Sequence, residues 1–294
     1  TARIGTGTGI NTAGGVEISA TSSGENEASA KGDVKSGKVG VGAAAAVILG
    51  GGTKTGDLKN TSVTSAELAR NVTAASLTIS AESDRSYTAD ATATAGGGKE
   101  STETASGGQS TSGDTLQKTE NSQQGTQAPP QGGSSKISVA AAVGVAAAQD
   151  VVSATLDAVT VHVTGDLKVD ATNSTGMATI GSGAATNPQS KVGVGIGVAL
   201  GIINNTTTAT IADGAVIANS GSVEVKTDTK ENTTGDFAEK LTANAIAGAS
   251  SSKVSVAGAL AVGISTSSST ASIGDNVQIS STGAVNVLAD NTSK

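Results

Sequence analysis

A strict alternation of bulky and very small residues marks one stretch of the chain, Lys191–Ile202, which reads KVGVGIGVALGI. A period of two is the period of a β-strand, with bulky groups on one face and almost nothing on the other. Glycine weakens a strand unless another backbone must approach it closely. The pattern therefore predicts a strand buried on both faces, with a second layer close against its small face. The motif recurs at Lys38–Leu49, Lys136–Ala147 and Lys253–Ile264.

A second type of strand precedes each lysine-led stretch and alternates alanine with polar residues. We expect it to lie against the glycine face, because two small faces can approach closely and still exclude water. The residues that define it are Ala28, Ala30, Ala89, Ala91, Ala93, Ala95, Ala178, Ile180, Ala243, Ala245, Ala247 and Ala249.

The lysines also set the register of an internal repeat. Twenty residues after each lysine stands an aliphatic residue, namely Leu58, Leu156, Ile211 or Ile273. In the last two repeats further aliphatics follow at every sixth position, separated by Gly, Asp and Ser residues that are typical of tight turns. Residues 1–22 match residues 270–291, and such self-similarity is the signature of a repeat array.

The repeats divide the chain into segments that we expect to form one continuous solenoid. The segment at 96–135 is rich in Gly, Ser, Thr and Gln, and Leu116 is its only bulky aliphatic residue. It cannot bury enough apolar surface to offset its ordering entropy, which predicts a disordered insert. The expected segments are 1–37 (the end of a preceding repeat and a connecting strand), 38–95, 96–135 (the insert), 136–190, 191–252 and 253–294 (a partial repeat).

These features predict an all-β protein, and a right-handed parallel β-helix is the expected form of the β-solenoid. An array of small stacked β-sandwich units is the alternative, since units of 55–62 residues could each form a pair of sheets. The six-residue spacing also permits a left-handed hexapeptide helix over a short stretch. If one coil takes roughly 20–30 residues, about 8–12 coils at ~4.8 Å would give a rod of about 40–60 Å.

The amino-acid composition agrees with thin layers and excludes some classes of binding partner. The 294 residues include one Phe, one Tyr, one Met and no Trp, so aromatic side chains cannot fill a core. The absence of Cys excludes disulfides and thiolate metal sites. A net charge of −7 argues against nucleic acid as a partner. The longest apolar run, Gly42–Leu49, is too short to insert across a membrane, and a chain that starts at Thr1 resembles a piece of a longer protein.

Few residues offer chemistry. His162 is the only histidine, and it should point out of its strand because Val161 and Val163 face the other way. A catalytic triad or a His-ligated metal site needs partners that the sequence does not supply, so we expect neither enzymatic activity nor a cofactor. Asp213 and Asp275 hold similar corner positions in successive repeats and are weak Ca²⁺ candidates, because calcium prefers oxygen ligands. Aspartate is more commonly found at such corners because it forms turns.

Two further patterns recur. The lysines at the strand starts stay in phase, and an outward charge there would block edge pairing. The runs Thr206–Thr210 and Thr88–Thr94 put hydroxyls on one face of a strand. Regular Thr rows could bind ice or glycan, although solvated β-branched residues with good strand propensity account for them more simply.

Three stretches of the chain resemble the repeats of large secreted bacterial exoproteins of the filamentous haemagglutinin and leukotoxin-like adhesin type. They are Ser220–Val225, Thr282–Ala289 and Ser190–Ile211. The resemblance implies a β-solenoid, an extracellular or cell-surface location and a stalk or adhesive role. The expected function is therefore a structural or adhesive segment of a long surface fibre. Its partners would be the flanking repeats and a host or neighbouring-cell surface, such as a glycan.

The alternative function is a specific surface-binding module for glycan or ice that uses the Thr-rich faces. A solenoid enzyme is less favoured, because no convergent cluster of charged residues stands out in the sequence.

Overall fold

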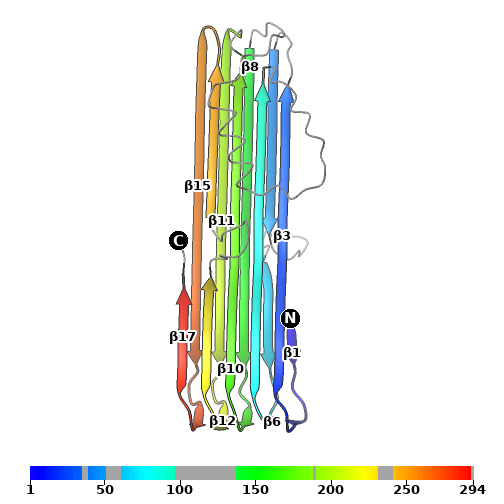
Figure 1. Ribbon diagram of the computed structural model, residues 1–294, viewed down its shortest axis with the longest axis vertical. Coiled ribbons are helices and arrows are strands. Elements are labelled where there is room, and N and C mark those ends of the chain that lie inside the picture. The colour runs from blue at the N-terminus through cyan, green and yellow to red at the C-terminus, as the bar shows by residue number, and fades with distance from the viewer. Residues whose placement is uncertain (35–38, 51–60, 97–136, 188–189, 231–240, 293–294) are drawn as a thin grey trace.

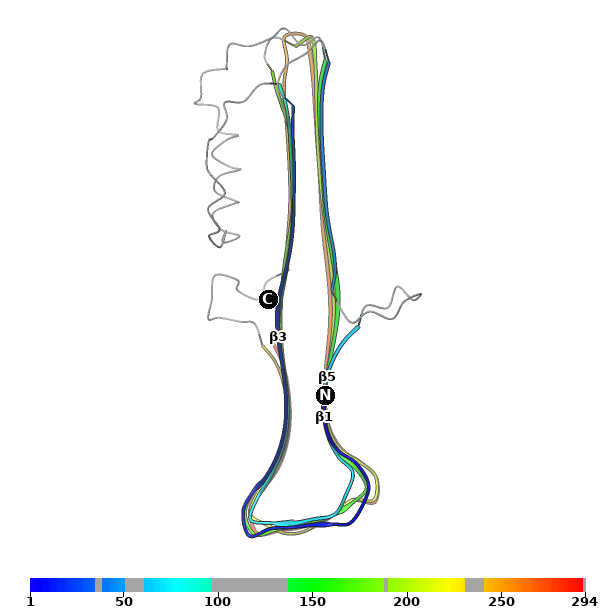
Figure 2. The same cartoon turned by 90° about the vertical axis from the view of Figure 1, so that its right-hand side faces the viewer.

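A computed structural model describes residues 1–34, 39–50, 61–96, 137–187, 190–230 and 241–292. These residues form an all-β solenoid of three parallel sheets, with no helix among them. Long strands lie side by side in Figure 1, and Figure 2 shows two long layers joined across a wider base. Apart from Gly96, the insert predicted at 96–135 lies outside the described residues.

Each sheet collects one kind of strand from successive coils. Sheet A contains β1 (Ala2–Ile4), β4 (Val39–Gly50), β5 (Thr61–Leu68), β8 (Ile137–Leu156), β11 (Val192–Ile211) and β15 (Val254–Ile273). Sheet B contains β2 (Ile10–Asn11), β6 (Val72–Ala74), β9 (Thr160–Val163), β12 (Val216–Ser220) and β16 (Gln278–Ser281). Sheet C contains β3 (Val16–Val34), β7 (Leu77–Ala95), β10 (Leu167–Thr186), β13 (Val223–Lys230), β14 (Leu241–Ser250) and β17 (Val285–Asn291).

One coil passes through the three sheets in a fixed order. In the coil of β8, the chain runs the length of sheet A, crosses the base in β9 and returns along sheet C in β10. Equivalent strands of neighbouring coils pair in parallel. The prediction of an all-β parallel solenoid is confirmed. The stacked-sandwich alternative is wrong, because every sheet continues from coil to coil instead of closing within one repeat.

The coil is much longer than the predicted 20–30 residues. The register steps by 55 residues from Ile137 to Val192 and by 62 from Val192 to Val254, because a full strand in sheet A or C has about 20 residues. The five strands on the main path of sheet C therefore span only about 20 Å across, whereas each long strand extends about 66 Å. The predicted rod of about 40–60 Å is wrong for this reason.

The repeat register derived from the lysines is confirmed in the structure. The residues that directly follow the four lysines are neighbours on adjacent strands of sheet A. They are Val39, Ile137, Val192 and Val254. The assignment of Leu58 is wrong, because Leu68 pairs with Leu156 and residues 51–60, which lie outside the described part, separate β4 from β5.

The six-residue spacing marks corners of the coil and not a hexapeptide helix. Ile211 ends β11 in sheet A, Ile217 lies in β12 of sheet B and Val223 begins β13 of sheet C. All three side chains are buried in the base. Here the large aliphatic core contains Leu68, Val72, Leu77, Ile79, Leu156, Val161, Leu167, Ile211, Ile217 and Val223 among others.

Away from the base, sheets A and C approach so closely that no bulky side chain fits between most of their inward positions. A Cβ placed on Gly181 or Gly183 of β10 would overlap the carbonyl oxygens of Val198 and Ile196 in β11. The predicted alanine layer is confirmed in β7, where Ala89 and Ala93 are fully buried, whereas in β10 the equivalent inward positions include Gly181 and Gly183. The assignment of Ala178 and Ile180 to this layer is wrong, because in β10 the register makes the neighbouring residues inward-facing.

Candidate functional site

The bulky side of the lysine-led strands forms an outer surface of the protein. The prediction that both sides of these strands are buried is wrong. Gly195 and Gly197 face sheet C, whereas Ile196 points outward and keeps 43% of its surface exposed. Ile196 is flanked on both sides, by Ala141 in β8 and Gly258 in β15, so its exposure reflects an open sheet face and not a sheet edge.

We call this surface the aliphatic face. It consists of the odd-numbered residues from Val39 to Leu49 and from Ile137 to Ala147, and the even-numbered residues from Val192 to Ile202 and from Val254 to Ile264. No residue of the aliphatic face carries a charge or a hydrogen-bonding side chain. Soluble proteins rarely expose so many adjacent apolar residues without a function.

Both ends of the aliphatic face are polar. Lys191 and Lys253 are exposed at one end, immediately before the first valine of β11 and β15. Lys38 and Lys136 lie outside the described residues. At the other end the outward positions become Asn204 and then threonines. The outer surface of β11 is therefore divided into an apolar half and a polar half, whereas the neighbouring β8 and β5 keep Val151 and Val63 at outward positions beyond this border, and Val63 is 55% exposed.

The predicted Thr rows lie on different layers. Thr206, Thr208 and Thr210 point outward from β11, and the hydroxyls of Thr210 and Ser272 lie 3.1 Å apart on neighbouring coils. Thr207 points inward and is fully buried. The run Thr88–Thr94 belongs to β7 in sheet C, so the two runs do not form one surface.

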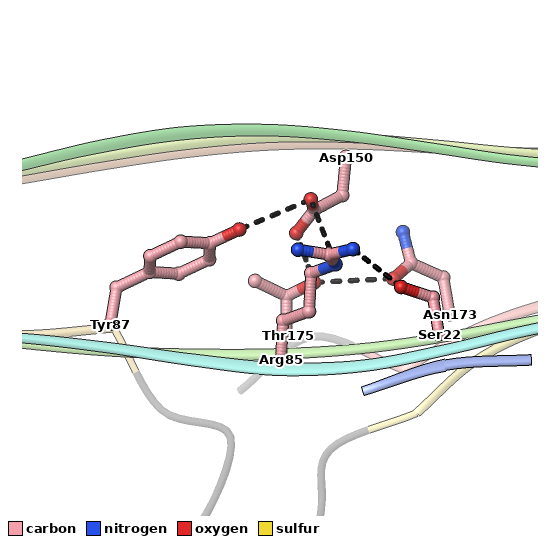
Figure 3. A network of polar contacts seen from close by, with 6 residues as sticks. All are labelled: Ser22, Arg85, Tyr87, Asp150, Asn173 and Thr175. Carbon is pink, nitrogen blue, oxygen red and sulfur yellow. Dashed lines mark hydrogen bonds and ion pairs between the residues drawn. The ribbon is translucent and has the colours of Figure 1, made fainter. Parts of the chain in front are cut away.

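A polar network lies between the sheets, where the sequence had suggested only small or aliphatic residues (Figure 3). Asp150 projects inward from β8 and is 1% exposed. Its carboxylate accepts hydrogen bonds from the Thr175 hydroxyl at 2.9 Å and from the Tyr87 hydroxyl at 3.3 Å. The Arg85 Nε atom lies 3.9 Å from the same carboxylate, and Arg85 also donates to the Ser22 hydroxyl.

Burial controls the ionisation of this network. Desolvation raises the pKa of the Asp150 carboxyl above its usual value, while the Thr175 hydrogen bond and the Arg85 charge oppose that rise. Burial, together with the nearby Asp150 charge, raises the pKa of Tyr87 to about 12. Because Asp150 is enclosed between two sheets, a substrate cannot reach it in the folded chain. We therefore interpret the network as part of the interior packing.

Asp150 belongs to a longer row of inward-facing polar residues, which we call the axial polar row; its members are buried or half-buried except Asn291 in the last coil, which is exposed. In sheet A it runs from coil to coil through Ser62, Asp150, Asn205 and Ser267. In sheet C the facing residues are Ser22, Ser83, Asn173, Thr229 and Asn291. The two sides are joined by hydrogen bonds, for example from the Ser267 hydroxyl to the Asn291 side chain at 3.0 Å.

Some side-chain atoms of this row have no protein partner. They are Ser83 Oγ, Asn173 Nδ2 and Asn205 Oδ1, and all are buried. Buried polar atoms in proteins are normally hydrogen-bonded to protein or to water. The axial polar row therefore offers positions for internal water between the aliphatic core and the alanine-glycine layer.

The calcium candidates lie at exposed corners. The Asp213 carboxylate accepts a hydrogen bond at 2.8 Å from the backbone N–H of Asp275 in the next coil. Asp166 acts in the same way toward Ser222, accepting from its backbone N–H at 3.0 Å and from its hydroxyl at 2.6 Å, and these hydrogen bonds lower the pKa of Asp166. Corner carboxylates thus tie successive coils together.

Within the described ranges, no group of three or more His, Cys, Asp and Glu residues is arranged to hold a metal ion. The calcium site at Asp213 and Asp275 stays a prediction. His162 points outward from β9 while Val161 and Val163 are buried, which confirms the orientation expected for this histidine. The expectation that the chain has no enzymatic activity also stays a prediction.

Comparisons with protein-family models, with curated proteins and with solved structures gave no match. The resemblance to haemagglutinin-type exoproteins therefore stays a prediction. The part of the chain that the structure describes contains no helix able to span a membrane.

Proposed function

We propose that the chain is a structural and adhesive segment of a long fibre that is secreted or displayed on a bacterial cell surface. One observation carries the structural part of this proposal. One position of the coil stays in register along the whole solenoid, and in successive coils it is occupied by Ile4, Leu68, Leu156, Ile211 and Ile273. Solenoid coils contact only their neighbours, so further coils of this kind can extend the rod without changing its cross-section.

The adhesive part of the proposal is supported by where contact residues lie. The polar network around Asp150 is buried, whereas the outward-facing Thr residues of β11 and β7 lie on the outer layers. A protein that binds through extended outer surfaces suits attachment to a broad partner, such as a host or neighbouring-cell surface, better than capture of a small molecule in a pocket.

Two measurements test this proposal. An antiserum against the chain should label filaments outside the producing cells in electron micrographs. Beads coated with the full chain should adhere to cultured epithelial cells or to bacteria more strongly than beads coated with albumin. Labelling confined to the cell interior would refute the fibre, and equal adhesion of both kinds of bead would refute the adhesive role.

The second candidate is a surface-binding module for glycan or ice. It is supported by the outward row Thr206, Thr208 and Thr210, which continues on the next coil through Thr270 and Ser272. Glycan-array binding or thermal hysteresis of the full chain would favour it. The Thr208→Lys variant should then lose the effect, while Thr92→Lys, on the outer side of sheet C, should retain it. An effect that is unchanged by Thr208→Lys would exclude this row as the binding surface.

A further inference from the structure

The aliphatic face has no role in the fibre geometry described above, yet it is large. It extends over four strands, and the shortest of these, β4, has 12 residues. Strands about 4.8 Å apart with a rise of about 3.3 Å per residue give it dimensions of about 19 Å by about 36 Å, or ~700 Å². The largest apolar patch of an ordinary soluble monomer is about 300–600 Å².

The exposure persists at the centre of the face, where neighbouring strands shield each side chain most. Val143 in β8 is 36% exposed and Ile196 in β11 is 43% exposed. The long segment outside the described residues, 97–136, has Leu116 as its only bulky aliphatic residue. That segment therefore lacks the apolar side chains needed to cover a surface of this size, which points to a second molecule.

We propose that two copies of the chain pair face to face through their aliphatic faces. Each copy would contribute ~700 Å², close to the ~800 Å² per partner that is usual in stable protein interfaces. Flat sheets with apolar side chains pack at about 10 Å from each other, so two such faces suit one another. None of the charged residues lies within the face, so the contact buries no charge, and salt screens the repulsion between two chains of net charge −7.

Charge at the border of the face selects the orientation of the pair. Lys191 and Lys253 mark one end of the strands. A two-fold axis parallel to the strands would place the lysines of both copies opposite each other. A two-fold axis parallel to the solenoid axis places them at opposite ends of the interface and makes the facing strands antiparallel. The second arrangement also keeps the two solenoid axes parallel, so that every added coil enlarges the interface. The pairing concerns the chain itself and does not depend on the proposed adhesive role.

Sedimentation and light scattering of the full chain test the pairing. The chain should be a dimer at micromolar concentration. Ile196→Lys should make the chain monomeric at the same concentration. Its circular dichroism should match that of the wild type, and its urea midpoint should match that of the wild type at a concentration low enough for the wild type to be monomeric, because the position is open to solvent in the single chain. The matched control is Thr208→Lys, which adds the same charge to the polar half of β11 and should remain dimeric. A wild-type chain that is monomeric throughout, or a dimer unaffected by Ile196→Lys, would overturn the proposal.

Cross-linking tests the orientation, since the chain has no cysteine of its own. With facing strands antiparallel, Ile196→Cys lies near its equivalent and should be joined by a short bis-maleimide reagent. Val192→Cys residues at opposite ends of the face would be about 33 Å apart and should not be joined. Efficient linkage of Val192→Cys would overturn this orientation. Flotation of the monomer with phosphatidylcholine vesicles, abolished by Ile196→Lys, would overturn the pairing and assign the face to lipid.

Discussion

Gly195 of β11 and Gly248 of β14 meet backbone to backbone across the interior of the solenoid. A Cβ on Gly195 would overlap the Gly248 carbonyl oxygen and would lie 2.8 Å from its carbonyl carbon. Gly183 of the preceding coil closes the same space, with its carbonyl oxygen 2.7 Å from that position. The two layers lie so close together here that only glycine fits at these positions.

The first prediction is that even one added methyl group is not tolerated at Gly195. Gly195→Ala must move two backbones apart and should lower the free energy of unfolding by at least about 3 kcal/mol, the upper part of the usual overpacking range, and Gly195→Leu by more. Ile196→Val removes a methylene from a side chain that is exposed in the single chain, so at a concentration at which the chain is monomeric it should change the free energy of unfolding by less than about 0.5 kcal/mol. Urea denaturation of the purified variants gives the comparison.

Gly258→Ala is the matched control for Gly195. Gly258 lies in β15 beside Ile196, and no atom lies within 4 Å of a Cβ built on it. The substitution should leave stability unchanged or raise it slightly, because alanine loses less entropy on folding than glycine. If Gly195→Ala and Gly258→Ala unfold at the same urea concentration, the close approach of the two layers is refuted.

The second prediction concerns Tyr87, whose pKa is raised to about 12 by burial and by Asp150. It is the only tyrosine and the chain has no tryptophan, so tyrosinate absorbance reports this one residue. The folded chain should titrate near 12, and the chain in denaturant near the ordinary value of about 10. Because the folded pKa is the higher one, stability should fall as the pH rises from about 10 to about 12. A folded-state titration near 10 would contradict the buried position.

The third prediction concerns Asp150, whose pKa is raised in the folded state. Between the unfolded value of about 3.9 and the higher folded value, the folded chain binds more protons than the unfolded chain. The contribution of Asp150 to stability should therefore increase as the pH falls from 7 toward 4. Asp150→Asn removes this contribution, so wild type should gain stability relative to the variant on acidification. Urea midpoints at both pH values measure it, and the opposite trend would mean that the Arg85 charge outweighs desolvation.

The fourth prediction concerns the corner that Asp213 forms with Asp275. Asp213→Ala removes the acceptor of the Asp275 N–H and should lower stability by about 0.5 kcal/mol, the low end of the range for a hydrogen bond, because the corner is exposed. Asp275→Ala keeps that N–H and should lower it less. Melting temperatures are compared with calcium and with EDTA. A calcium-dependent increase in wild type that both variants lose would establish the calcium site, whereas equal values would exclude it.

The register of the coils could be predicted because it depends on local rules. Alternation with a period of two assigns residues to opposite faces of a strand, and the recurring lysines aligned Val192 with Ile137 and Val254 correctly. Leu58 was assigned wrongly because residues 51–60 lengthen that repeat by an amount that no periodicity shows. The close layer opposite Gly195 could also be predicted, since glycine weakens a strand and occurs within one mainly where another backbone approaches closely.

The surface and the buried network could not be predicted in the same way. Alternation shows that Ile196 and Val198 share a face, but it does not show what covers that face, and burial of the bulky side is the ordinary expectation. The sequence does not reveal the network around Asp150, because the partners of Asp150 belong to other strands: Tyr87 is 63 residues away and Thr175 is 25 residues away. The one available signal was an acidic residue at an inward position of the β8 alternation.

The parallel register of the coils also determines how a rod of this kind would carry mechanical load. Hydrogen bonds between coils run along the solenoid axis, so a force that pulls the ends of the rod apart stretches all the bonds of one junction together. The junction between β8 and β11 alone pairs residues over the whole length from Ile137 to Leu156. Rupture should therefore release an entire coil in a single step at high force, whereas a force applied at one corner would peel the same bonds apart one after another at low force.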